Sequence, residues 1–174
     1  MVIIGVTGMI SSGKMTLSEL ISDKYGAPLF DSTAEAKEII NEKGIDNSSI
    51  MKNPGKLYHV EDEVYPIVTK RLEKFINRHR NDKYVVLDIL LLFELGLEKY
   101  CDIVINAYSS FDNRIKRAQK NRDMSIDLFV FLNNKQMSDE DRNKKADYTV
   151  DMDSSTVEEN LEDIMRKIDA GNNS

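Results

Sequence analysis

The chain has 174 residues, enough for one domain with a sizeable core. Its formal net charge of −6 at pH 7 argues against a broad nucleic-acid surface, because such surfaces gather lysines and arginines. Cys101 is the single cysteine, which excludes an intrachain disulfide and favours a reducing compartment. Because Cys101 opens an apolar run, we expect its thiol to lie in the core. The opening "MVIIGVTG" and the run "ILLLF" are too short to cross a bilayer. We therefore expect a soluble cytoplasmic protein, monomeric or weakly self-associating, that binds neither nucleic acid nor membranes.

Short β-rich runs alternate along the chain with longer stretches of helical periodicity. Strands are expected at 2–7, 28–30, 84–87, 103–106 and 148–150. Helices are expected at 14–24, 32–43, 61–80, 111–120, 126–135 and 155–168. This alternation predicts an α/β protein with three layers, in which helices cover both faces of a five-stranded parallel sheet. The apolar run "YVVLDILLLF" predicts a central strand, and the polar stretch 44–57 predicts a mobile connection.

The first predicted strand leads into "GMISSGKMT", residues 8–16, which has the spacing of a phosphate-binding P-loop. Glycines in such a loop let backbone N–H groups point at phosphate oxygens, and the following helix adds its positive dipole end. Lys14 supplies a cation for the terminal phosphates. A glycine turn that merely joins strand and helix is the alternative. The residues expected to hold a nucleotide here are Gly8, Ser11, Ser12, Gly13, Lys14, Met15 and Thr16.

Met15 is the exception to the P-loop pattern, because a Ser or Thr normally stands at this position. The missing hydroxyl oxygen is a ligand of Mg²⁺, a hard cation for which a thioether is a poor ligand. Thr16 cannot replace it directly, since the next residue of a helix points about 100° away. The sequence therefore predicts phosphate binding with slowed metal-dependent catalysis.

Four further stretches follow the P-loop in a recognisable order: "GAPLFDSTA", "VYPIVTKRLEKF", "LDILLLFELGLEKYCDIVI" and "KQMSDEDRNKKADYTVDMDSS". With the P-loop they make the chain, from about residue 2 to 168, resemble the dephospho-CoA kinases, a family of P-loop small-molecule kinases. The resemblance implies a P-loop kinase fold with acceptor-side helices at about 32–81 and a helical lid at about 114–142. It implies an enzyme of coenzyme A biosynthesis that uses ATP and Mg²⁺ to phosphorylate the ribose 3′-hydroxyl of dephospho-CoA.

Several positions depart from the family pattern. The acidic turn D-x-D retains Asp31 but has Thr33 in place of the second acid, and the histidine of a His-Pro pair is Tyr65. In the lid, Arg117 matches the first of two arginines, whereas the second falls on Asn121, beside Arg122. Two more family residues, a proline and an arginine, are replaced by Leu90 and Leu132.

Phosphoryl transfer needs cations around the transferred group and an acid that orients the acceptor hydroxyl. The candidate cations are Lys14, Arg117, Arg122 and Arg142. Arg142, within "DEDRNKK", is equally open to interpretation as a solvated surface charge.

Two carboxylates at predicted strand ends complete the candidate machinery. Asp88 can hold Mg²⁺, because parallel sheets bind ligands at the carboxyl ends of their strands, or it can be a solvated strand-end acid. Asp31 can serve the acceptor or simply cap the next helix. Other functions stay open: a nucleoside monophosphate kinase, a degenerate P-loop protein that binds nucleotide without efficient catalysis, and a scaffold without a ligand.

Overall fold

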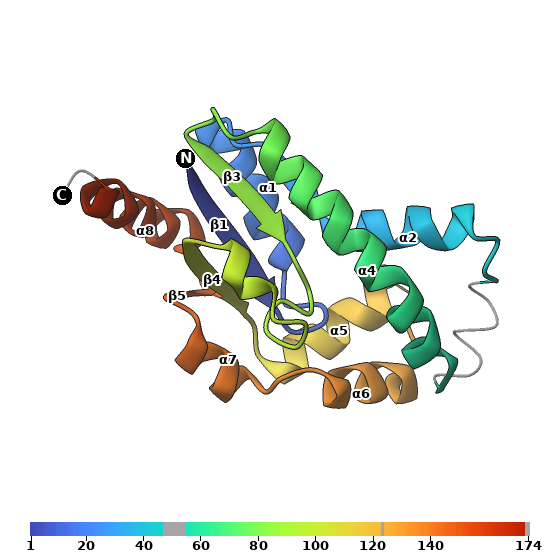
Figure 1. Cartoon of the computed structure of the whole chain (residues 1–174). Helices are drawn as coiled ribbons and strands as arrows, with labels where there is room; N and C mark the ends of the chain where they lie inside the picture. The colour runs from blue at the N-terminus through green and yellow to red at the C-terminus, as the bar shows by residue number, and fades with distance from the viewer. Residues whose placement is uncertain (47–54, 123, 173–174) are drawn as a thin grey trace.

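The computed structural model describes residues 1–46, 55–122 and 124–172 (Figure 1). Its sheet has five parallel strands in the order β2-β3-β1-β4-β5, which confirms the predicted parallel sheet. The strands are β1 (Val2–Gly8), β2 (Leu29–Asp31), β3 (Tyr84–Asp88), β4 (Ile103–Tyr108) and β5 (Tyr148–Asp151). In the register, Asp88 lies beside Val6 on one side and beside Asp31 on the other, so both acids lie at the carboxyl edge of the sheet.

The six predicted helices form within a few residues of the expected positions. They are α1 (Lys14–Tyr25), α2 (Ser32–Glu42), α4 (Gly55–Arg78), α5 (Phe111–Arg122), α6 (Ile126–Lys135) and α8 (Val157–Asn172). A further helix, α7 (Asp139–Lys145), and a short 3₁₀ helix, η1 (Leu97–Tyr100), were not expected from the sequence. Figure 1 shows α5, α6 and α7 below the carboxyl ends of the strands.

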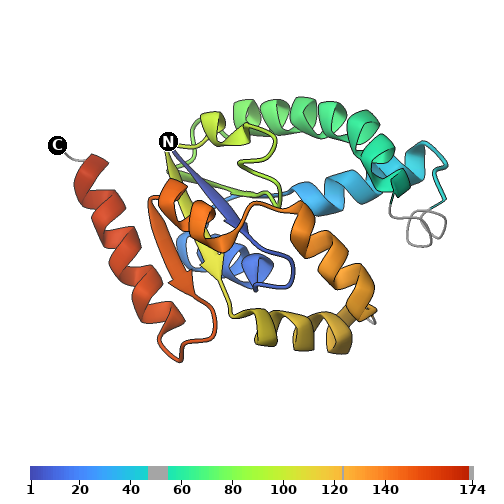
Figure 2. The ribbon, with the colours of Figure 1, turned by 90° about the horizontal axis from the view of Figure 1, so that it is seen from below.

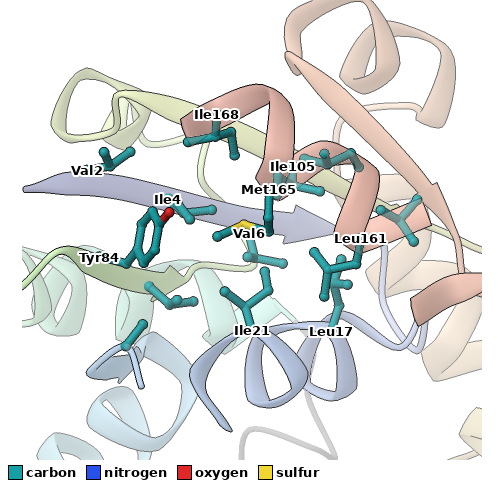
Figure 3. Packing of buried hydrophobic residues seen from close by; sticks show 14 of the residues in the cluster. Val2, Ile4, Val6, Leu17, Ile21, Tyr84, Ile105, Leu161, Met165 and Ile168 are labelled. Atoms are coloured by element: carbon teal, nitrogen blue, oxygen red, sulfur yellow. The ribbon is translucent and has the colours of Figure 1, made fainter. Parts of the chain in front are cut away.

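Two hydrophobic clusters, one on each face of the sheet, make the fold three-layered. Because strand side chains alternate in direction, Val2, Ile4 and Val6 of β1 share one face, where they pack against α1 and α8 (Figure 3). Ile3 points to the other face, in a cluster that includes residues of α2 and α4. Burial of both faces explains why the inner strands are apolar throughout instead of alternating with polar residues.

Two local expectations were wrong or only partly right. The run 84–93 is not one strand: β3 ends at Asp88, and the leucines after it lie in turns. Leu92 is fully buried and packs in the same cluster as Ile3 of β1. Of the predicted connection 44–57, residues 47–54 lie outside the described residues, and 55–57 belong to helix α4. None of the described helices has both the length and the apolar character that a membrane span requires.

Candidate active site

The loop between β1 and α1 is held in a tight, partly left-handed conformation. Gly13 has φ 95° and Ser11 has φ 60°, and the N–H of Ser12 donates to the carbonyl of Met9, which closes the loop on itself. A Cβ on Gly8 would lie 2.6 Å from the carbonyl oxygen of Ala107, so only glycine fits there. No side chain caps the start of α1. A helix N-terminus without a side-chain cap is the arrangement that binds anions.

Lys14 and Asp88 form an ion pair beneath this loop. Asp88 is fully buried at the end of β3, and Lys14, the first residue of α1, is 9% exposed. The hydroxyl of Ser18, one turn further along α1, donates to the second carboxylate oxygen of Asp88 at 2.8 Å. The alternative that Asp88 is a solvated strand-end acid is therefore wrong.

A cleft of about 380 Å³ lies between the loop and the start of α2. One wall is residues 9–16 of the loop and α1, and the opposite wall comes from β2 and α2. The lining outside residues 9–16 is Asp31, Thr33, Ala34, Lys37, Leu90, Arg117 and Asn121. The cleft thus brings most of the predicted loop residues together with Asp31 and Arg117. Four of the departures from the family pattern also line it, at Met15, Thr33, Leu90 and Asn121.

Asp31 has the helix-capping role that was one of its two interpretations. Its Oδ1 accepts the N–H groups of Thr33 at 2.9 Å and Ala34 at 3.0 Å, which fixes the first turn of α2. Because Asp31 also lines the cleft, capping does not remove it from the candidate site. Two roles can be combined in one carboxylate that is held rigidly.

Arg142 lies away from the cleft lining and is fully buried, so its interpretation as a solvated charge is wrong. Its guanidinium donates to Thr7 Oγ1 and to Glu94 Oε1, both at 2.7 Å. Glu94 neutralises the charge, and the two contacts bind α7 to the end of β1 and to the segment that follows β3. The structure therefore gives no support to Arg142 as a nucleotide-binding residue. Arg122 is the last residue of α5, and its side chain lies outside the described part of the structure.

Two residues from the stretches that carry the family resemblance fix the segment after α6, Gln136 by a bond to the loop and Glu94 by a bond from the segment after β3. Gln136 Oε1 accepts the N–H of Ile10 at 2.8 Å, and Glu94 Oε1 accepts the N–H of Met137 at 2.8 Å. The sequence did not assign these roles, although "LLFE" and "QM" were the most specific parts of the resemblance. Figure 2 shows α5 and α6 curving round the loop that leads into α1.

Helices α5 and α6 also pack on the loop, through a small hydrophobic cluster. Ile10 contacts a cluster that contains Phe129 of α6 and Ala118 of α5, with Leu132 packed against it. Arg114 is 3% exposed and donates to the carbonyl of Ile10 and to Asn133 of α6. Leu132, in place of the family's arginine, thus has a packing role.

Tyr65, in place of the family's histidine, lies outside the main cleft in a second hollow of about 330 Å³. Burial, reinforced by the charge of Glu94, raises the pKa of Tyr65 to about 12. The phenol is therefore neutral near pH 7 and cannot exchange protons as a histidine would.

The donors at the cleft fit Mg²⁺, although no group of three or more His, Cys, Asp or Glu side chains in the described residues forms a metal cage. Mg²⁺ is usually held by one or two carboxylates together with substrate phosphates and water. Asp31 and Asp88 carry carboxylates on adjacent strand ends. Asp31 lines the cleft, whereas Asp88 lies outside its lining, fully buried and paired with Lys14. Met15 lines the same cleft with a thioether, which leaves the protein one oxygen ligand short.

Comparison with known proteins decides the family. A family model described as dephospho-CoA kinase matches residues 47–158, more than half of the chain. The chain belongs to the dephospho-CoA kinase family. The dephospho-CoA kinase of Bartonella henselae is 33% identical over 87% of this chain and 89% of its own. That of Fusobacterium nucleatum is 28% identical over 96% of this chain and 95% of its own.

Solved structures show the same fold. TT1252 from Thermus thermophilus matches with a TM-score of 0.77 and 25% identity over 98% of this chain and 97% of its own. The dephospho-CoA kinase from Campylobacter jejuni matches with a TM-score of 0.66 and 21% identity over 98% of each chain. A shikimate kinase from Acinetobacter baumannii, 15% identical over 98% of this chain and 94% of its own, also has a TM-score of 0.66. The predicted P-loop kinase fold is confirmed, and the alternative of a nucleoside monophosphate kinase is not favoured.

Proposed function

We propose that the chain transfers the γ-phosphoryl group of ATP to the ribose 3′-hydroxyl of dephospho-CoA. The observation that carries this proposal is the single cleft in which the P-loop faces Asp31 and Thr33 across a space of about 380 Å³. A donor phosphate on the loop and an acceptor hydroxyl on the opposite wall would meet there. Membership in the dephospho-CoA kinase family supports this acceptor over other nucleotides.

The residues of the cleft divide between phosphate and acceptor. Backbone N–H groups of the loop and the start of α1 hold the β- and γ-phosphates, and Lys14 neutralises charge on the transferred group. Arg117 adds a second cation at the side of the loop. Asp31, fixed as a helix cap, orients the acceptor hydroxyl, while Thr33 contributes only a neutral hydroxyl.

Asp88 would hold Mg²⁺ at this site, where the ion would neutralise phosphate charge during the transfer. Ser18 holds the Asp88 carboxylate in a fixed orientation, because its hydroxyl donates to one of the two oxygens. Met15 provides no oxygen at the start of α1, so we propose that turnover is slow relative to ATP binding.

The rest of the assignment follows from the same proposal. Helices within residues 32–81 form the acceptor side, and residues 114–142 form a lid over the nucleotide. We further propose that the chain acts in the cytoplasm as a monomer or weak homo-oligomer on a small-molecule substrate, without nucleic acid or membrane partners.

The experiment is a comparison of kcat/KM for dephospho-CoA with the values for AMP, CMP and UMP, using purified protein, ATP and Mg²⁺. We expect dephospho-CoA to be preferred by at least about 100-fold, since acceptor contacts set specificity. Lys14→Ala should lower kcat/KM at least about 100-fold. Lys24→Ala, at the other end of α1 and paired with Glu162 on the surface, is the matched control and should change little.

Two outcomes would contradict the proposal. Faster transfer to a nucleoside monophosphate would make that nucleotide the acceptor. ATP binding without transfer to any acceptor, even by Met15→Ser, would identify a degenerate P-loop protein.

A further inference from the structure

Arg117 is held against the back of the phosphate loop by contacts from three segments of the chain. Its Nη1 donates to the carbonyl oxygens of Ser11 and Ser12 at 3.2 Å each and to the hydroxyl of Ser109 at 2.9 Å. Its side chain is 34% exposed and lines the cleft. The arginine is thus fixed at the rim of the site while part of it stays accessible to a ligand.

Asp153, in the segment between β5 and α8, is the acid that completes this arrangement. Its Oδ1 accepts from Arg117 Nη2 and from the hydroxyl of Ser109, both at 2.7 Å, and its Oδ2 accepts the N–H of Ser110 at 2.8 Å. Its own N–H donates to Asp151 Oδ1 at 2.9 Å, which orders the segment. The three hydrogen bonds that its carboxylate accepts favour the charged form of Asp153.

The charge of Asp153 is secure across the physiological pH range. Burial acts to raise the pKa of Asp153, but the hydrogen bonds from Ser110 and Ser109 outweigh it and hold this pKa well below its usual range. The ion pair with Arg117 is therefore present whenever the protein is folded near neutral pH.

We propose that Asp153 is a positioning residue for phosphoryl transfer, which acts by fixing the Arg117 guanidinium at the rim of the cleft before ATP binds. A free arginine loses rotamer freedom when it meets a phosphate, and an arginine that is already oriented loses less. Ser109 touches both partners, so the pair and this hydroxyl form one connected unit. This role rests on the proposed function, because Arg117 is useful to the reaction only if ATP occupies the cleft.

A purely structural role is the competing explanation, since Asp153 also ties Ser110, just before α5, to the segment after β5. The two explanations differ in how Asp153 depends on Arg117. A positioning residue has no effect on ATP once the arginine is removed, whereas a structural residue does. A double-mutant cycle separates them.

The experiment measures the dissociation constant of ATP by calorimetry for the wild type, Asp153→Ala, Arg117→Ala and the double variant. We expect each single variant to bind ATP about 10-fold more weakly, and the double variant to be within about 2-fold of Arg117→Ala. The KM for dephospho-CoA should stay within about 2-fold in Asp153→Ala. Asp163→Ala, which removes an exposed ion pair with Arg166 on α8, is the matched control and should leave ATP binding unchanged.

Asp153→Asn keeps an acceptor oxygen and the side-chain shape, and serves if Asp153→Ala fails to fold. It should bind ATP with an affinity between those of the wild type and Arg117→Ala, and this difference should vanish in the Arg117→Ala background. Additive effects in the cycle, or unchanged ATP affinity in folded Asp153 variants, would overturn the role proposed for Asp153 and leave the proposed function intact. Absence of ATP binding by the wild-type chain would instead overturn the proposed function and, with it, this role.

Discussion

Met15 places a thioether in the cleft at the first turn of α1, directly after the lysine that pairs with Asp88. Met15→Ser restores an oxygen at this position, so kcat should rise at least about 10-fold, equivalent to about 1.4 kcal/mol of transition-state stabilisation. The change in ATP affinity should be smaller, because the loop N–H groups and Lys14 are unaltered. Steady-state kinetics and calorimetry on the same preparation measure both.

Met15→Leu is the control for this substitution, since it is apolar, similar in size and supplies no oxygen. It should behave like the wild type. A kcat that does not move in Met15→Ser would mean that another oxygen already takes the place of the missing hydroxyl.

Ser11 is the one non-glycine residue with positive φ in the described part of the chain, at 60°. Such a conformation costs an ordinary residue roughly 1 to 2 kcal/mol. Glycine avoids this cost, but its greater freedom in the unfolded state lowers the free energy of unfolding by about 0.5 to 1 kcal/mol. Ser11→Gly should therefore raise the free energy of unfolding by up to about 1 kcal/mol. Urea denaturation tests this, with Ser11→Ala, which keeps the strain, showing no gain. A clear loss of stability in Ser11→Gly would contradict the strain argument.

Cys101 packs at the edge of the core, and burial, followed by the charges of Asp102 and Glu98, raises its pKa to about 12. The native thiol therefore stays protonated at pH 8, whereas the unfolded thiol titrates near its ordinary value. Alkylation by iodoacetamide at pH 8 should be at least about 100-fold slower in the native protein than in urea. Equal rates would show an accessible thiolate.

The raised pKa of Cys101 also makes the stability of the fold depend on pH. The buried thiol contributes its full stabilisation below the pKa of the unfolded thiol, and this contribution is lost as the pH rises through 9 towards 12.

Local motifs made some residues predictable and left others out of reach. Lys14, Asp31 and Asp88 follow strands at fixed spacings, so the sequence could predict that they meet at one edge of the sheet. Arg142 contacts Thr7, 135 residues away, and Asp153 contacts Arg117, 36 residues away. No sequence spacing predicts such contacts. Those contacts depend on how the chain folds back over the loop.

At the scale of elements, α7 shows why a short charged helix escapes detection. Its sequence "DEDRNKK" has no apolar periodicity, but Ser138 caps it, acids occupy its first turn and bases its last, as the helix dipole favours. Its one buried residue, Arg142, is the contact that attaches it to the sheet. Helices with apolar stripes, such as α8, were predictable because burial of the stripe determines them.

Glu94 lies in the segment after β3 and links this segment to two others. It pairs with Arg142 of α7, and it accepts the N–H of Met137, which follows α6. Glu94→Gln should lower the free energy of unfolding by about 3 kcal/mol, because Arg142 is fully buried and would lose its counter-charge. Chemical denaturation measures this change. Glu140→Gln, which removes an exposed pair with Lys144 on the same helix, should cost less than about 0.5 kcal/mol. Similar losses for the two variants would show that Arg142 does not need its partner.

At the scale of the whole molecule, the alternation of strands and helices was enough to predict a parallel sheet with two covered faces, and the structure has one. The alternation did not predict the strand order, which places β1 between β3 and β4 and so puts the phosphate loop at the centre of the carboxyl edge. The same order brings β2 and β3 together, and with them the carboxylates of Asp31 and Asp88. The candidate site is thus a product of topology as much as of motif.

Identification of the reaction product shows whether this cleft transfers phosphate from ATP to dephospho-CoA. Purified protein with ATP, Mg²⁺ and dephospho-CoA should form ADP and coenzyme A in equal amounts, and phosphorus NMR should place the new phosphate on the ribose 3′-oxygen. Lys14→Ala should form both products much more slowly than the wild type. ATP hydrolysis to ADP and free phosphate, with dephospho-CoA recovered unchanged, would mean that dephospho-CoA is not the acceptor.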